Sequence, residues 1–308
     1  MHTRVAISCL LMMIAAALRR VTFSCVKQYY SVHNMRTFAS LSSSVDDSAT
    51  TGTPFIVVNT ATRGIGLEYA RQSLETSDAM VLALARRVSL KLLELKNEFP
   101  ERLTVIEDYD LEQQESIEVA GKTINEIISR HSNGYISVLF NAAGILGDGK
   151  NTAGPERSIS DIDRTWLEKT LNINMIGHVM LTKALSPLFK TKRPIEHKTK
   201  IVYVSARVGS IGDNKLGGWY SYRISKSALN MFVKTLSLEL KRYNCCCIAI
   251  HPGTTSTDLS APFAKNVSND KLFSTAHSVG LMMKVIDGLR FPDDNGKFYA
   301  YDNKEIEW

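Results

Sequence analysis

The sequence predicts an α/β fold in which a doubly wound parallel sheet of about seven strands is covered by helices on both faces. Short apolar segments rich in β-branched residues recur along the chain. Segments with the three- and four-residue apolar spacing of amphipathic helices lie between them. The apolar segments are continuous rather than alternating, which indicates strands buried on both faces. Strands that alternate with helices in this way predict a parallel sheet.

The individual elements follow from this pattern in chain order. The first strand is predicted at 55–59, where four apolar residues precede a glycine-containing turn, and the first helix at 67–74. Further strands are predicted at 80–85, 103–107, 136–140, 200–204, 247–250 and 296–300. Further helices are predicted at 89–98, at 117–128, at 166–189 and around Tyr222. Because there is no second set of elements and no repeat, we expect one domain from 52 to 308.

Residues 1–51 are predicted to be a targeting leader and a polar linker. Residues 1–45 hold five of the 37 Lys and Arg residues and no Asp or Glu, and the other 32 basic residues nearly balance the 31 acidic ones. The basic pI is therefore no argument for a nucleic-acid partner. The acid-free, Ser-rich leader is typical of a mitochondrial transit peptide, with a secretory signal or a cytoplasmic protein as alternatives. Its apolar run, 5–18, is too short for a comfortable membrane span.

Three adjacent cysteines occur at 245–247. Adjacent cysteines suit neither paired disulfides nor the spaced ligands of a zinc site. We therefore expect a buried strand in a reducing compartment, and we expect no metal site.

A glycine turn lies directly between the first predicted strand and the first predicted helix. It contains Gly64 and Gly66, preceded by Thr60 and Arg63. Glycines at this place let the backbone approach a pyrophosphate, which the free N–H groups at the helix N-terminus bind. The position favours a dinucleotide site, with a plain turn as the alternative.

The end of the second predicted strand bears on the choice between NAD and NADP. A site that prefers NAD carries an acidic residue there for the ribose hydroxyls, whereas this chain has Arg86 and Arg87. A guanidinium group pairs with phosphate oxygens through two N–H groups. Arg86, with Arg63, therefore favours NADP(H), and a solvated arginine pair is the alternative.

Tyr222 and Lys226 are four residues apart on a predicted helix, and so lie on the same face. A phenol with an ordinary pKa near 10 is a poor acid–base group at neutral pH. A neighbouring ammonium group favours the phenolate and is expected to lower that pKa. The pair taken alone also fits a solvated helix face.

Taken together and in order, these motifs resemble the classical short-chain dehydrogenase/reductase family over about residues 54–308. Segments 207–214, 217–220 and 260–267 and the C-terminal Trp308 are similar to its C-factor and sniffer-type carbonyl reductases. The resemblance implies a single-domain Rossmann fold and an NADP(H)-dependent oxidoreductase. The cofactor-binding positions that it implies are Thr60, Arg63, Gly64, Ile65, Gly66, Arg86, Asp110, Leu111, Asn141, Ala142, Ala143, Gly144, Tyr222, Lys226, Pro252, Gly253, Thr255 and Thr257.

The same resemblance implies a catalytic set of Asn174, Ser205, Tyr222 and Lys226. Tyr222 would donate a proton to the carbonyl oxygen while NADPH delivers hydride to the carbon. Lys226 would hold the ribose hydroxyls, and Asn174 would position a water that links Lys226 to solvent. The partner would be a small carbonyl or alcohol substrate under a lid at 259–273, and relatives of this type pair as dimers or tetramers.

The chain departs from the family pattern at two positions. Thr60 stands where the family has glycine, and a β-branched residue with a left-handed backbone costs about 1–2 kcal/mol. Ala206 stands where the family has the serine that hydrogen-bonds the reacting oxygen, which leaves Ser205 as a candidate only if the local backbone turns it inward. Two hypotheses follow: an active carbonyl reductase, and a catalytically weak nucleotide-binding homologue that acts through partners.

Overall fold

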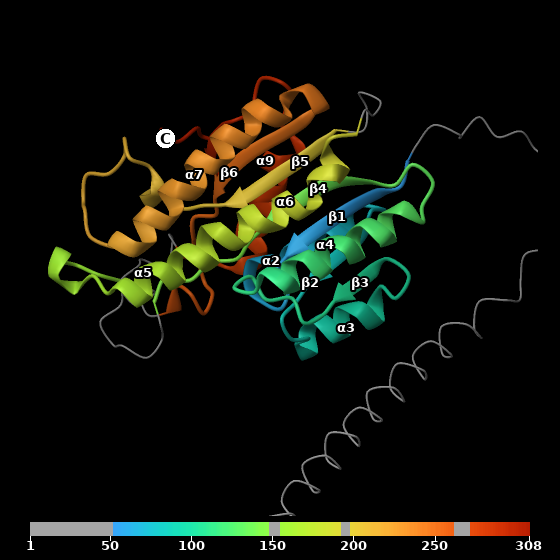
Figure 1. The fold of residues 1–308 in the computed structure, drawn as a ribbon, viewed down its shortest axis with the longest axis horizontal. Coiled ribbons are helices and arrows are strands. Elements are labelled where there is room, and N and C mark those ends of the chain that lie inside the picture. Colours follow the sequence, from blue (N-terminus) through green and yellow to red (C-terminus); the bar gives the residue numbers. More distant parts are fainter. Residues whose placement is uncertain (1–51, 148–154, 192–197, 262–271) are drawn as a thin grey trace, which may run out of the picture. The chain divides into compact units, whose positions relative to one another are not determined.

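Seven parallel strands form one sheet in this computed structural model, which describes residues 52–147, 155–191, 198–261 and 272–308 (Figure 1). The strand order is β3-β2-β1-β4-β5-β6-β9. The order reverses between β1 and β4, and this is the point at which ligands bind in open parallel sheets. The predicted fold class is confirmed. The strands are β1 Pro54–Asn59, β2 Met80–Leu84, β3 Leu103–Ile106, β4 Tyr135–Asn141, β5 Thr199–Val204, β6 Cys245–His251 and β9 Phe298–Ala300.

Helices cover both faces of the sheet (Figure 1). On one face, α4 (Gln114–Ser129), α6 (Gly177–Phe189) and α7 (Tyr220–Leu240) share a single core cluster with the sheet. On the other face, α2 (Gly64–Thr76), α3 (Leu90–Glu98) and α9 (Thr275–Asp287) share a second cluster. The remaining short helices are α5 Arg164–Leu171, η1 Ile159–Asp161, η3 Arg207–Gly209 and η4 Lys241–Tyr243.

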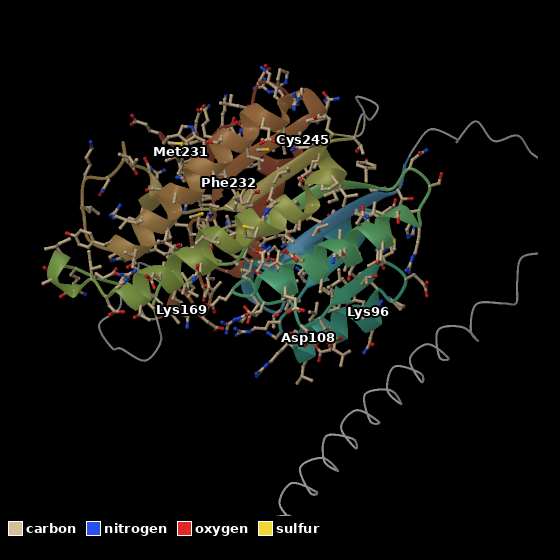
Figure 2. All side chains as sticks on the ribbon, viewed as in Figure 1. Lys96, Asp108, Lys169, Met231, Phe232 and Cys245 are labelled. Carbon is tan, nitrogen blue, oxygen red and sulfur yellow. The ribbon has the colours of Figure 1, made fainter. Side chains whose placement is uncertain are left out.

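The strands are apolar throughout because both of their faces are covered. In β1, Phe55 and Val57 belong to the cluster under α4 and α6, whereas Ile56 and Val58 belong to the cluster under α2 and α9. The cysteines of β6 alternate in the same way, and all three are buried. Cys245, labelled in Figure 2, begins this strand. The expectation of a buried cysteine strand is confirmed.

Three features differ from the sequence-based expectations. The predicted helix at 166–189 is interrupted by a π-turn, η2 (Asn172–Ile176), between α5 and α6. Helix α9 was not predicted, although Val279, Met282 and Ile286 have helical spacing and are buried. Two two-residue strands, β7 (Thr254–Thr255) and β8 (Leu272–Phe273), pair with each other and are too short to leave a sequence pattern.

The predicted leader, 1–51, lies outside the described residues, as does most of the predicted lid. Among the helices of the described ranges, none is long and apolar enough to cross a bilayer. The same ranges hold no group of three or more His, Cys, Asp or Glu residues arranged to bind a metal ion.

Candidate active site

A cavity of about 410 Å³ opens at the carboxyl ends of the central strands. Segments that follow β1, β4, β5 and β6 meet there with the first turns of α7. These segments come from distant parts of the chain, and the parallel sheet brings them to one edge. The predicted site residues that line the cavity are Ile65, Ala142, Ala143, Gly144, Ser205, Tyr222, Lys226, Pro252, Gly253, Thr255 and Thr257.

The glycine turn has the form that a pyrophosphate requires. The first turn of α2 has no side-chain cap and no acidic residue, so its N–H groups remain available to an anion. A Cβ on Gly66 would lie 2.3 Å from the carbonyl oxygen of Thr60, so only glycine fits there. The same turn contacts the loop after β6, because a Cβ on Gly64 would lie 3.8 Å from the Thr257 methyl group. The turn therefore fits the phosphates of a dinucleotide.

Thr60 has the left-handed backbone that the sequence analysis considered, with φ = 67°. Its hydroxyl group donates a hydrogen bond to the carbonyl oxygen of Asn59 at 2.5 Å. A β-branched side chain in this region is strained by about 1–2 kcal/mol.

Charged residues lie where the sequence predicts that the adenosine end of the cofactor binds. Arg86, at the end of β2, has its guanidinium 3.9 Å from the carboxylate of Asp110. Arg63 forms a 2.7 Å ion pair with Asp258, and both of these side chains are largely exposed. Leu111, in contrast, is buried, and its side chain packs against Gly177 rather than lining the cavity. Both arginines are therefore accessible to a phosphate group.

Tyr222 and Lys226 are buried side by side in the first two turns of α7, 8% and 2% exposed respectively. The ammonium nitrogen of Lys226 lies 5.9 Å from the centre of the Tyr222 ring and donates to the Val204 carbonyl oxygen at 2.9 Å. Burial raises the pKa of Tyr222 above its ordinary value, because an ionised phenolate would lose its hydration. Burial lowers the pKa of Lys226 to about 8 for the same reason.

The expectation that the pKa of Tyr222 is lowered is therefore wrong, because burial raises this pKa. At neutral pH Tyr222 carries its proton. It is in the form that a proton donor needs.

Asn174 lies in the π-turn and holds the strand-end loop against α7. Its side chain binds both the N–H and the carbonyl oxygen of Ile145, at 2.7 and 2.9 Å, and donates to the Ser225 hydroxyl group at 3.0 Å. A Cβ on Gly144 would lie 3.5 Å from the Lys226 ammonium nitrogen and 3.6 Å from the Asn174 oxygen. The structure thus brings Asn174, Gly144 and Lys226 together, and the amide of Asn174 is already bonded within the protein.

Ser205 and Ala206 face different surroundings. The Ser205 hydroxyl group donates to the side-chain oxygen of Asn230 at 2.6 Å, and both residues are buried. Ala206 has an extended backbone and belongs to the apolar cluster that contains Tyr222 and Leu146. The residue beside Tyr222 is therefore the alanine, and the proton of the Ser205 hydroxyl group is used within the protein.

Several site residues were not found from the sequence. Leu146, Val208 and Trp219 were not predicted to lie there; together with Leu259 of the predicted lid they form the apolar wall around Tyr222. These residues follow no spacing rule, because they come from loops whose contacts depend on the fold.

A buried polar network under the glycine turn was also not found from the sequence. Asn59 donates to Asn141 at 3.0 Å and lies 3.1 Å from Nδ1 of His178, whose Nε2 is 3.0 Å from the Ala143 carbonyl oxygen. Burial and the Lys226 charge lower the pKa of His178 to about 3, so the ring is neutral and Nε2–H donates to Ala143. The network fixes the strand end that lines the cavity.

Comparisons with known proteins agree with this geometry. A family model described as short chain dehydrogenase matches residues 54–268. The C-signal protein of Myxococcus xanthus is 32% identical over 175 residues, which are 57% of this chain and 94% of that protein. An NADPH-bound carbonyl reductase from chicken fatty liver has a TM-score of 0.70 at 25% identity, covering 84% of this chain and 100% of that one. The carbonyl reductase Sniffer of D. melanogaster has a TM-score of 0.70 at 26% identity, covering 83% and 99%.

We predict that Thr60→Gly stabilises the domain. The change removes a left-handed strain of about 1–2 kcal/mol, whereas the greater flexibility of glycine in the unfolded chain costs about 0.5–1 kcal/mol. The free energy of unfolding therefore rises by up to about 1.5 kcal/mol. Denaturant unfolding measures this change in the free energy of unfolding. Thr62→Gly is the matched control, because Thr62 has no positive φ and its hydroxyl group bonds the Arg87 carbonyl oxygen. The control loses stability; a loss of stability in Thr60→Gly would contradict the strain.

Proposed function

The chain belongs to the short chain dehydrogenase family of oxidoreductases, and we propose that within it this protein is an NADP(H)-dependent carbonyl reductase with Tyr222 as its general acid. The observation that carries the proposal is the buried Tyr222–Lys226 pair at the edge of the cavity that the strand ends form. A protonated phenol in a dry pocket donates its proton only to a group that binds beside it.

The residues of this chain divide the work of carbonyl reduction. NADPH, when bound, supplies the hydride. Tyr222 donates the proton from its hydroxyl group to the carbonyl oxygen, and Lys226 holds the ribose hydroxyls and stabilises negative charge that develops on the phenol oxygen. The apolar wall of Leu146, Val208 and Trp219 excludes water from the reacting carbonyl group.

Two arginines support NADP(H) over NAD(H). Arg86 lies 3.9 Å from the Asp110 carboxylate, and Arg63 is exposed beside the glycine turn. Either guanidinium group can bind a 2′-phosphate through two N–H groups. The chicken carbonyl reductase with a similar fold was solved with NADPH bound.

NADPH absorbance over a panel of aldehydes, ketones and quinones tests the reductase directly. We expect turnover with some of these compounds, and we expect Tyr222→Phe to lower kcat by roughly 10²–10⁴-fold because the proton donor is lost. NADPH binding should survive this change, since the variant alters only the hydroxyl group. Turnover that persists in Tyr222→Phe would contradict the assignment of Tyr222.

The second candidate function is a nucleotide-binding protein with little catalysis. Ala206 favours it, because the carbonyl oxygen then receives a hydrogen bond from Tyr222 without the second one that a serine beside it would donate. Tight NADPH binding with no turnover on any compound of the panel would support this candidate.

We predict that Ala206→Ser increases carbonyl reduction. A hydroxyl group at 206 would enter the cluster beside Tyr222, and one such donor contributes roughly 10²–10³-fold to the rate. Steady-state kcat/KM on the best panel substrate measures it. Ser205→Ala is the matched control and should change kcat little, because its hydroxyl group bonds Asn230. A collapse of turnover in Ser205→Ala would show instead that Ser205 is the donor.

We also propose that two copies of the chain pair through α7. Ile224, Met231 and Leu238 are exposed large apolar residues at seven-residue intervals on α7, and Met231 is labelled in Figure 2. A stripe with this spacing suits an antiparallel or parallel helix pair. Light scattering of the purified chain tests the pairing.

We propose further that the leader at 1–51 directs the protein to mitochondria. Fractionation of cells that express a tagged full chain tests this location.

A further inference from the structure

We propose that Glu156 is a positioning residue for the reaction, because it caps α7 from outside the helix and so fixes the turn that carries Tyr222. The proposal rests on the proposed function of Tyr222 as the proton donor. Glu156 follows β4 and precedes η1, and is therefore remote in sequence from α7.

The chain enters α7 through an unfavourable backbone. Gly217, Gly218 and Trp219 all have positive φ, at 64°, 64° and 55°. Trp219 occupies the position before the first helical residue, where Ser, Thr, Asp or Asn normally accepts a hydrogen bond from the helix. An indole ring has a donor and no acceptor, so it cannot cap the helix. The first turn of α7 needs its acceptor from elsewhere.

Glu156 supplies that acceptor with both its side chain and its backbone carbonyl group. One carboxylate oxygen accepts from the Ser221 backbone N–H at 3.3 Å, and the other accepts from the Ser221 hydroxyl group. The Glu156 carbonyl oxygen accepts from the Trp219 N–H at 2.5 Å. The side chain of Arg223 binds the carbonyl oxygens of Gly217 and Gly218 in the same entry. The entry is thus held at four of the five residues 217–221, and the last of them is directly followed by Tyr222.

The segment that Glu156 holds borders the proposed reacting end of the cavity. Glu156 is only 7% exposed. A carboxylate is rarely buried unless its oxygens accept hydrogen bonds, as those of Glu156 do from Ser221. It holds Trp219 through its backbone N–H and Ser221, the residue directly before Tyr222. The rings of Trp219 and Tyr222 line the cavity with their centres 6.3 Å apart. A displacement of about 1 Å in such a group lowers a rate by up to roughly 10²-fold.

The test compares Glu156→Ala with Glu156→Gln. We expect Glu156→Ala to lower kcat by roughly 10–100-fold while the NADPH dissociation constant changes by less than about twofold, since the glycine turn is untouched. Glutamine has the same length, keeps an acceptor for the Ser221 N–H, and can donate to the Ser221 hydroxyl group. We therefore expect it to recover kcat to within about threefold of the wild type.

Amide hydrogen exchange gives a readout that does not need activity. Exchange at residues 219–223 should become faster in Glu156→Ala and remain near the wild-type rate in Glu156→Gln. Asp163→Ala is the matched control, because Asp163 caps the neighbouring α5 by accepting from the Trp166 N–H at 2.8 Å. This control should lower thermal stability and leave kcat unchanged.

Two results would overturn the proposal. One is an unchanged kcat in Glu156→Ala; the other is a parallel fall of kcat, NADPH affinity and thermal stability that Glu156→Gln does not reverse. If the wild type reduces no carbonyl compound, the proposed function fails, and the exchange data alone decide on Glu156. Faster exchange at 219–223 in Glu156→Ala then supports the cap, and unchanged exchange overturns it.

Discussion

The desolvation of one phenol and one ammonium group on the same helix face governs this site. Tyr222 and Lys226 are both buried, and burial acts on them in opposite senses: it raises the pKa of Tyr222 and lowers that of Lys226 to about 8. Burial thus favours the neutral form of each group. Residues with strongly shifted pKa values are typical of sites where protons or charges are transferred during a reaction. The remaining structure either creates this burial or orients the pair within it.

The parallel sheet creates the burial by bringing together strand ends that are far apart in sequence. Gly144, which follows β4, lies beside the Lys226 ammonium group, and the carbonyl oxygen of Val204 at the end of β5 accepts a hydrogen bond from it. Asn174 joins the β4 loop to α7 through Ile145 and Ser225. Glu156 fixes the entry of the same helix. Four separate segments therefore determine where one hydroxyl group points.

The sequence predicted the parts of this arrangement that depend on local patterns. The sheet and the glycine turn follow from apolar periodicity and from the places where glycine is required. The left-handed backbone at Thr60 was anticipated because a threonine stood where glycine was expected. Contacts between remote loops leave no such pattern, and so Trp219, Glu156 and the Asn59–His178 network were found only in the structure. The direction of the Tyr222 pKa shift was wrong because the sequence indicates neighbouring charges and does not indicate burial.

The dependence of NADPH affinity on pH tests most directly whether the buried ammonium group acts on the cofactor. If Lys226 must be protonated to hold the ribose, the dissociation constant is nearly constant below the pKa of about 8 and rises above it, by up to tenfold per pH unit. The folded-state pKa lies below the ordinary value of 10.5, so the loss begins well before free lysine titrates. Fluorescence titrations from pH 7 to 9.5 should show this rise in the wild type and a flat, weaker affinity in Lys226→Met. A wild-type affinity that does not change across this range would contradict the account.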